Sequence, residues 1–441
     1  MTDRSSQKLA TRILVALAIG AVLGSLALLI GQGSPNFLAA CVKFSDAVLD
    51  PIGQVFLRLL FFVVIPLVFA SLTLGIVQLG SLSRLGPLAG RTALFFFANM
   101  AIGVALGLLV MNAVKPGNRL SDEAKERLFA QYGTSAEKTV ASQKKVEEQL
   151  SLKSVVEMFM PRNLPGTVTG FSRDAIGEVL PLILFAILLG AAGVQLQESR
   201  RQGLEKALET VTELMTRIVH FALLLAPIAV PAMIFSVIVK VGLDILLALM
   251  LFVVCCLGVM AVHLFGTMSV WLALLAKENP AKFFWKIRAV LITAFSTSSS
   301  NATLPTSLQV CREELKLSPS TSGFVLPLGA TMNMSGTALF EGCVVLFIAQ
   351  IYGVDLTLQR QLTLLFLTVL SAVAVSGIPG GSLPLIAGLL VTFGIPAEGI
   401  AIILGVDRIL DMSRTVVNVG ADVVTATIVD RRMGVQEVPT G

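Results

Sequence analysis

Charged residues are scarce in this sequence. Asp, Glu, Lys and Arg make up 14% of its 441 residues, whereas hydrophobic residues make up 55%. Because charged residues form nearer a quarter of a soluble domain, this composition excludes an ordinary soluble protein and predicts a polytopic membrane protein. The Lys and Arg residues cluster in a few short connections and form no basic face, which argues against a nucleic-acid-binding protein.

Metal-ligand spacing is also missing. The five cysteines lie mostly inside apolar runs, so we interpret them as packing residues, and we expect no bound cofactor and no metal beyond a coupling cation. No small-residue cleavage site follows the first apolar run, which is too long for a signal peptide. We therefore expect this run to be the first membrane helix.

Long apolar runs are abundant. Runs of about twenty residues or more can cross a hydrocarbon core of ~30 Å. They predict eight transmembrane helices near residues 11–30, 52–78, 90–113, 177–196, 206–240, 243–272, 323–350 and 401–428.

Two further apolar stretches, 281–316 and 360–396, are interrupted in the middle by STSSSNATLP at 296–305 and SGIPGGSLP at 376–384. Serine, glycine and proline break helices, so each stretch predicts a re-entrant helical hairpin. In the C-terminal half a hairpin followed by a span occurs twice, entering from opposite sides. Such inverted repeats with broken helices are typical of transporters whose binding site lies near the bilayer midplane.

The positive charges fit this topology when both termini are cytoplasmic, because Lys and Arg then gather in the inner connections. The connection at 116–175 is rich in both signs of charge and long enough to translocate regardless of charge, so we expect an external, partly helical insertion there. We expect a multi-pass protein of the plasma (inner) membrane.

The last predicted span contains the stretch DRILDMSRTVVNVGAD at 407–422, with three carboxylates, two guanidiniums and an asparagine. A charge at membrane depth costs at least ~2.5–3.5 kcal/mol, so this much polarity indicates function. An internal structural ion pair between Asp411 and Arg414 is the alternative, although it does not account for the other polar residues. Intervals of three and four place on one helical face Asp407, Asp411, Arg414 or Thr415, Asn418 and Asp422.

The stretch GATMNMSGT at 329–337 interrupts another apolar span with small and polar residues. We expect local unwinding around Asn333, which would free carbonyl oxygens to act with Asn418 and Asp422 as ligands of Na⁺ or a similar hard cation. A glycine-rich packing face is the alternative, but it does not require an asparagine. Glu341 follows one turn after Thr337, and we interpret it either as a proton carrier or as a carboxyl that only forms hydrogen bonds.

Together, the motifs SSSNATLP, GATMNMSGTALFEG, SGIPGG and DRILDMSRTVVNVGAD, in that order, resemble the glutamate transporter family of dicarboxylate/amino acid:cation symporters. The resemblance implies a homotrimer with an elevator mechanism. It implies that scaffold and trimerisation helices are formed by 1–78 and 116–240, and the moving transport domain by 79–115 and 241–430.

The resemblance also implies roles for individual residues. Arg414 would bind the side-chain carboxylate of an acidic amino acid and Asp411 its ammonium group, with both hairpin tips closing over the substrate. The other substrate-binding residues implied are Ser299, Ser300, Met334, Thr337, Ile378, Pro379, Gly380, Asp407, Thr415 and Asn418. The implied cation ligands are Gly329, Thr331, Asn333, Asn418 and Asp422, and the implied proton carrier is Glu341.

The sequence departs from the sodium-coupled pattern of the family at several ligand positions. Ser335 replaces an aspartate of an additional sodium site, Asn99 and Met100 replace a threonine-serine pair, and Ala372 and Val375 replace hydroxyls. Fewer charged and oxygen ligands weaken the binding of a dehydrated cation. We therefore expect reduced sodium coupling, with protons or one retained cation site contributing to the driving force.

The leading function is import of glutamate or aspartate by secondary active symport, and transport of a C4-dicarboxylate or another organic acid on the same fold is the alternative. A channel is disfavoured by two gated hairpins around one site. We do not expect an enzyme. A shared-proton aspartate dyad is excluded because Asp411 and Asp422 lie about 16 Å apart along one helix at 1.5 Å per residue.

Overall fold

The computed structural model describes residues 3–82, 87–121, 163, 179–375 and 382–433, and these form helices and connections without a β-strand. The predicted all-α architecture is therefore confirmed for the part of the chain that is described. Most of the predicted insertion at 116–175, and the residues Ile378, Pro379 and Gly380, lie outside these ranges.

Five segments are long and apolar enough to cross a membrane, judged by length and composition. These are Val15–Gly33, Leu88–Arg119, Leu224–Val241, Asp244–Ala276 and Pro319–Ile351, and each overlaps a predicted span. The predicted spans at 52–78 and 177–196 fall on shorter apolar stretches, Ile65–Val77 and Leu184–Val194. The total of eight spans stays a prediction.

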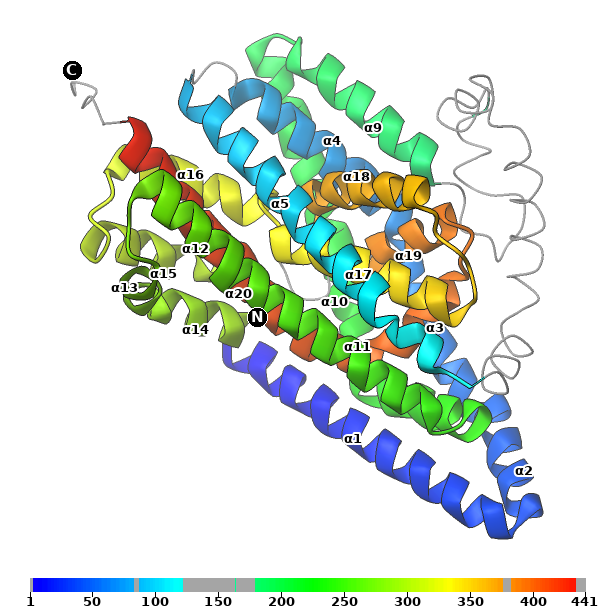
Figure 1. The fold of residues 1–441 in the computed structure, drawn as a ribbon. Helices are drawn as coiled ribbons and strands as arrows, with labels where there is room; N and C mark the ends of the chain where they lie inside the picture. The colour runs from blue at the N-terminus through cyan, green and yellow to red at the C-terminus, as the bar shows by residue number, and fades with distance from the viewer. Residues whose placement is uncertain (1–2, 83–86, 122–162, 164–178, 376–381, 434–441) are drawn as a thin grey trace.

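The N-terminal half consists mainly of long helices. Its elements are α1 (Asp3–Gly33), α2 (Pro35–Phe44), the π-helical η1 (Ser45–Leu49), α3 (Asp50–Phe62), α4 (Val64–Leu82), α5 (Pro87–Val114), the 3₁₀ turn η3 (Pro116–Arg119), α9 (Val179–Val194) and α10 (Glu198–Val241). The predicted span at 52–78 is interrupted at Val63, between α3 and α4. Figure 1 shows α1 along one edge of the molecule, where it packs against α10.

The contact between α1 and α10 depends on a missing side chain. A Cβ atom added to Gly20 would lie 2.6 Å from the Cα of Pro231, so only glycine lets the two backbones approach this closely. Only 28% of the most apolar 18-residue stretch in Val15–Gly33 is buried, so α1 contacts the rest of the chain along one narrow face.

The C-terminal half holds the broken helices. Its first elements are α11 (Asp244–Ala261), η4 (Val262–Thr267), α12 (Met268–Trp271), η5 (Leu272–Ala276), α13 (Pro280–Lys286), α14 (Arg288–Thr297) and α15 (Ser300–Glu313). They are followed by α16 (Pro319–Met332), α17 (Ser335–Ile351), α18 (Leu358–Ala374), α19 (Leu383–Thr392), η6 (Ala397–Gly399) and α20 (Ile400–Met433). Figure 1 shows α20 running through this half from end to end, with α14, α16 and α17 packed against it.

The predicted break in the first hairpin lies between α14 and α15, which pack against each other. Ser298 adopts a left-handed conformation with φ of 51°, and Ser299 then caps α15 by accepting a hydrogen bond from the backbone N–H of Ala302. Pro305 was expected to take part in the break, but it lies inside α15. The chain therefore turns at Ser298 and Ser299, before it reaches the proline.

The predicted unwinding at 329–337 is confirmed and confined to two residues. Asn333 and Met334 have non-helical backbone angles, so α16 ends at Met332 and α17 begins at Ser335. The most apolar 18-residue stretch within Pro319–Ile351 is 94% buried, which keeps its unpaired backbone groups inside the protein rather than in lipid.

Candidate functional site

One face of α20 supplies most of the polar groups in the core. Asp407 is 7% exposed and Asp411 is 3% exposed, so these carboxyl groups are removed from bulk water as the periodicity predicts. The same face buries Arg414, Thr415, Asn418 and Asp422. These polar residues make α20 less apolar than the five long segments that could cross a membrane. The helices packed around α20 bury its polar face.

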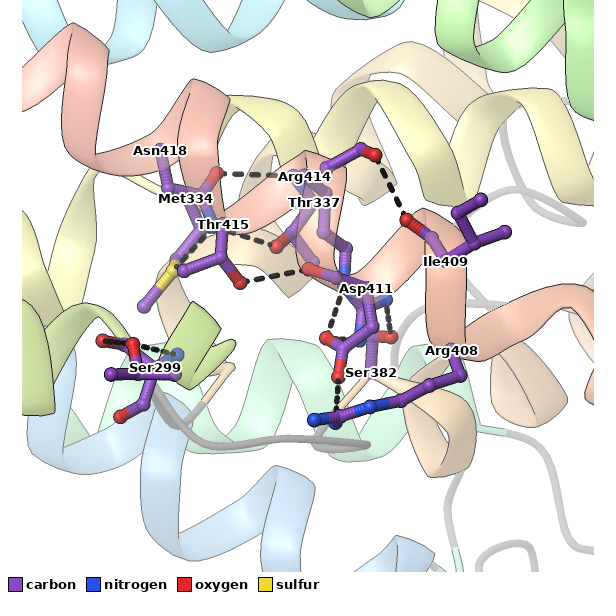
Figure 2. A network of polar contacts seen from close by, with 12 residues as sticks. Ser299, Met334, Thr337, Ser382, Arg408, Ile409, Asp411, Arg414, Thr415 and Asn418 are labelled. Atoms are coloured by element: carbon purple, nitrogen blue, oxygen red, sulfur yellow. Dashed lines mark hydrogen bonds and ion pairs between the residues drawn. The ribbon is translucent and has the colours of Figure 1, made fainter. Parts of the chain in front are cut away.

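Asp411 and Arg414 form a direct ion pair. The Nε and Nη2 atoms of Arg414 donate to Oδ1 of Asp411 at 2.9 and 2.7 Å. The Nη1 atom of Arg414 donates to the hydroxyl of Ser382, just before α19, and its guanidinium lies 5.0 Å from the ring centre of Phe340. The ion pair considered as an alternative from the sequence is thus present, and it links α20 to the second hairpin and to α17 (Figure 2).

Two residues of this cluster were missed by sequence reasoning. Ser382 holds Arg414 from the second hairpin, and Nη1 of Arg408 donates to Oδ2 of Asp411 at 3.3 Å. The position of Arg408, three residues before Asp411 on the same helix, was a signal that could have identified it. Nothing in the sequence places Ser382 against Arg414, because that contact depends on how the hairpin docks.

Asn418 ties α20 to the start of α17. Its Oδ1 atom accepts hydrogen bonds from the backbone N–H groups of Gly336 at 2.7 Å and Thr337 at 3.2 Å. Its Nδ2 atom donates to the sulfur of Met334 at 3.2 Å and to the hydroxyl of Thr337 at 3.1 Å (Figure 2). Asn418 therefore caps α17 from another helix, and the side-chain oxygen that was expected to face a cation accepts two N–H groups instead.

A second polar group joins α5, the α16–α17 break and α20. The Nδ2 atom of Asn333 donates to Oδ1 of Asp422 at 2.9 Å, and the Nδ2 atom of Asn99 donates to Oδ1 of Asn333 at 3.3 Å. Gly329 lies against the Asp422 carboxyl group so closely that an added Cβ would overlap it. These amide and carboxylate groups are the hard oxygen donors that a cation such as Na⁺ prefers.

Thr331 does not join this group. Its side chain is exposed, and its hydroxyl donates to the carbonyl oxygen of Leu328 at 2.9 Å. A helix turns by 100° per residue, so Gly329 and Thr331 point to different faces of α16. The structure thus brings together three of the predicted cation ligands, Gly329, Asn333 and Asp422, and leaves Thr331 outside.

Glu341 lies deeper in α17 and is fully buried. Neither of its carboxyl oxygens has a hydrogen-bond partner among the described residues, and the same holds for the Ser335 hydroxyl and for both ring nitrogens of His263. The Ser371 hydroxyl group on α18 is nevertheless a neighbour of this carboxyl group, so both interpretations of Glu341 stay open.

At the first hairpin, Ser300 is buried at the start of α15 and Ser299 caps that helix. Figure 2 shows Ser299 in the same close-up as Met334 and Thr415, whose hydroxyl donates to the backbone oxygen of Asp411 at 2.8 Å. Within the described ranges, no cluster of three His, Cys, Asp or Glu side chains could hold a metal ion.

Comparison with known proteins gives a consistent result along the whole chain. It is 32% identical over 431 residues to a proton/sodium-glutamate symport protein of Bacillus subtilis (strain 168), covering 97% of this chain and 93% of the relative. It is 28% identical over 433 residues to a proton/glutamate-aspartate symporter of Escherichia coli (strain K12), covering 96% and 92%. It is 31% identical over 450 residues to the human neutral amino acid transporter B(0), covering 96% and 81%. Residues 9–432 match the family model described as "Sodium:dicarboxylate symporter family", and the chain belongs to that family.

Proposed function

We propose that this protein is a secondary active symporter that imports an acidic amino acid, glutamate or aspartate, together with a cation. The observation that carries the proposal is the buried Asp411–Arg414 pair, in which a carboxylate and a planar guanidinium lie side by side at 2.7 Å. A dicarboxylic amino acid carries the complementary groups, an ammonium and a carboxylate. On binding, each substrate group would replace one partner of the ion pair, so neither side chain would be left unpaired.

The names of several relatives support an acidic substrate, because they are proton/sodium-glutamate and proton/glutamate-aspartate symporters. One relative is a neutral amino acid transporter, and a neutral substrate side chain needs no guanidinium partner. The proposal of an acidic substrate therefore depends on Arg414. Transport of a plain C4-dicarboxylate is the second candidate, but it leaves Asp411 without an ammonium to bind.

The proposed coupling uses one cation site and one proton carrier. Asn333, Asp422 and Gly329 would hold the cation, and Glu341 would carry a proton through the buried part of α17. Ser335, in place of an acidic ligand, supplies no charge for an additional sodium ion, so a sodium gradient alone would drive uptake weakly.

The wider architecture of the proposal is an elevator. A transport domain of residues 79–115 and 241–430 would carry the site across the membrane against a scaffold of 1–78 and 116–240. Three copies would assemble as a homotrimer in the inner membrane with cytoplasmic termini. Cross-linking of cysteine pairs placed across the two domains would test the movement.

Uptake of radiolabelled substrate into proteoliposomes tests the function directly. We expect aspartate or glutamate to accumulate, succinate to be taken up far less, and an imposed proton gradient to increase the rate. Preferred uptake of succinate would favour the dicarboxylate alternative. Full accumulation on a sodium gradient, unchanged by pH, would contradict the proposed coupling.

A further inference from the structure

The short helix α13, before the first hairpin, carries one large aromatic side chain that the protein does not cover. Phe283 is buried, and the ring of Phe284 packs edge-on against that of Phe265, with 5.0 Å between the ring centres. Trp285, by contrast, is 69% exposed. Tryptophan gathers where membrane proteins pass from hydrocarbon to water, because its ring is apolar and its indole N–H is polar. Trp285 therefore indicates that α13 lies at the level of the lipid headgroups.

The segment around this tryptophan is positively charged. Residues 280–297 contain three cations, Lys282, Lys286 and Arg288, and no carboxylate. All three cations are exposed, and none has an ion pair among the described residues. Arg431, at the same end of the protein, differs because it pairs with Glu278 at 3.1 Å. The unpaired cations give α13 and the start of α14 a local field that attracts anions.

Arg288 is held in place by Trp285. Its Nη1 atom donates to the backbone oxygen of Trp285 at 2.6 Å, and its guanidinium lies 4.5 Å from the centre of the indole ring. This is its one side-chain hydrogen bond within the described residues, so its other N–H groups are available to an acceptor. A planar guanidinium can donate two parallel hydrogen bonds to a phosphate group. The contacts with Trp285 fix these donors before a ligand arrives.

The face of α14 that follows Arg288 is apolar and exposed. Ile292 lies one turn after Arg288 and is 65% exposed, and Phe295 lies about one turn further and is 42% exposed. Residues spaced by three and four share one face of a helix. A cation followed by exposed apolar side chains matches a phospholipid, in which acyl chains follow a charged headgroup. A free phosphate ion would leave Ile292 and Phe295 uncovered.

The position of α13 fits a lipid of the inner leaflet. Figure 1 shows α13 at the end of the molecule where α16 begins and α20 ends. In the proposed topology this end is cytoplasmic. The cytoplasmic leaflet carries a negative surface potential from its anionic lipids, which attracts Lys and Arg residues close to the membrane.

We propose that α13 and the start of α14 bind the headgroup of an anionic phospholipid in the cytoplasmic leaflet. Arg288 holds the phosphate group, and Lys282 and Lys286 add positive charge beside it. The acyl chains lie along the exposed apolar face of α14. This interaction is separate from substrate binding and does not depend on which substrate is carried.

Tryptophan fluorescence tests the proposal without a transport assay. The chain has two tryptophans, so a Trp271→Phe background reports on Trp285 alone. The purified protein is placed in phosphatidylcholine vesicles that contain an equal fraction of either phosphatidylglycerol or phosphatidylcholine brominated in the acyl chains. Bromine quenches a nearby tryptophan, so the ratio of the two quenching strengths measures the preference for the anionic headgroup. We expect a preference of about fivefold or more.

Arg288→Gln in this background should lower the preference by about fivefold, the attraction that one cation adds near an anionic surface. Because Arg288 also contacts Trp285, Lys286→Gln is the second variant. Lys286 is exposed and has no ion pair among the described residues, so its substitution should leave the fold intact and lower the preference similarly. Arg217→Gln is the matched control, since this exposed arginine lies on α10 and is paired with Glu213. Its preference should equal that of the background.

Equal quenching by the two brominated lipids would overturn the proposal, and so would a preference that persists in both the Arg288 and the Lys286 variants. Inorganic phosphate, compared with chloride at the same ionic strength, should leave the preference unchanged. If phosphate abolishes it, the segment binds a free anion and the lipid assignment is wrong. Failure to take up aspartate would contradict the proposed function alone, because the fluorescence measurement requires no transport.

Discussion

The amide of Asn333 donates to the Asp422 carboxyl group across 2.9 Å and thereby joins the break between α16 and α17 to the far end of the α20 stripe. The oxygen of the same amide accepts from Asn99 on α5 at 3.3 Å. The α16–α17 break, α5 and α20 therefore meet at Asn333, beside the proposed cation site.

Gly329→Ala should weaken cation coupling. The new Cβ would overlap the Asp422 carboxyl group, so that carboxyl group would have to move away from Asn333. A displacement of this kind should raise the cation concentration needed for half-maximal uptake by about tenfold, the cost of a lost charge-assisted hydrogen bond. Gly323→Ala on the same helix is the control, because its Cβ would meet nothing within 4 Å. Equal cation dependence in both variants would contradict the assignment.

Arg414→Lys should abolish selective uptake of acidic amino acids although the charge is kept. A lysine offers a single ammonium and cannot donate to Asp411 and Ser382 in the directions that the guanidinium does. We expect the KM for aspartate to rise by about a hundredfold or more, measured as labelled uptake at saturating cation. Normal aspartate uptake by this variant would show that substrate binding does not need the planar guanidinium group of Arg414.

Asn418→Ala should destabilise the protein as well as the site. The substitution leaves the N–H groups of Gly336 and Thr337 without their acceptor at the start of α17. Loss of such a cap costs about 1–2 kcal/mol, so thermal unfolding in detergent should begin several degrees lower. Asn418→Asp keeps an acceptor oxygen and should recover part of this stability. If both variants melt like the wild type, the cap is unimportant.

Glu341→Gln should remove the dependence of uptake on a proton gradient. Glutamine has the shape of glutamate, and because neither carboxyl oxygen has a partner among the described residues, the substitution should leave the fold intact. Uptake would be measured with equal and unequal pH across the liposome membrane. Glu213→Gln, at an exposed glutamate, is the matched control. A retained response to the proton gradient would exclude Glu341 as the carrier.

Lys240→Met should lower stability without changing substrate selectivity. The Lys240 ammonium lies 2.5 Å from Asp50 and 2.6 Å from Asp46, and Ser236 also donates to Asp50 at 2.6 Å. Lys240 is largely buried, so its removal leaves Asp50 with less compensation, at a cost of about 1–3 kcal/mol. Thermal unfolding would report this loss, and the preference of uptake for aspartate over succinate should be unchanged.

Much of the fold could be predicted because membrane helices leave a strong signal in the sequence. The breaks at Ser298 and Asn333 were both foreseeable, since small polar residues inside apolar runs have few other roles. The interruption at Val63 also has a signal in the sequence, which the predicted span at 52–78 did not take into account. Pro66 lacks the backbone N–H that would donate to the carbonyl of Phe62, so the helix is broken within the turn before the proline.

The candidate site, like the fold, could be predicted from the sequence only in part. The burial of the α20 stripe followed from its period, and that period depends only on residues in one helix. The partners of those residues did not follow, because they come from other helices. Asn418 accepts N–H groups of α17, Arg414 meets Ser382, and Thr331 points away from Asp422. Contacts of this kind depend on docking distances of a few ångströms, which the sequence does not encode locally.

The unequal burial of the helices has a consequence for how the protein would respond to its lipids. In the most apolar 18-residue stretch of α1 only 28% of the residues are buried, whereas in that of the segment Pro319–Ile351 94% are buried. A change in bilayer thickness or fluidity would therefore act first on the rim, where α1 can tilt against α10. The polar core would feel such a change only through the movement of whole helices, so lipid composition should alter the rate of turnover before it alters which substrate is chosen.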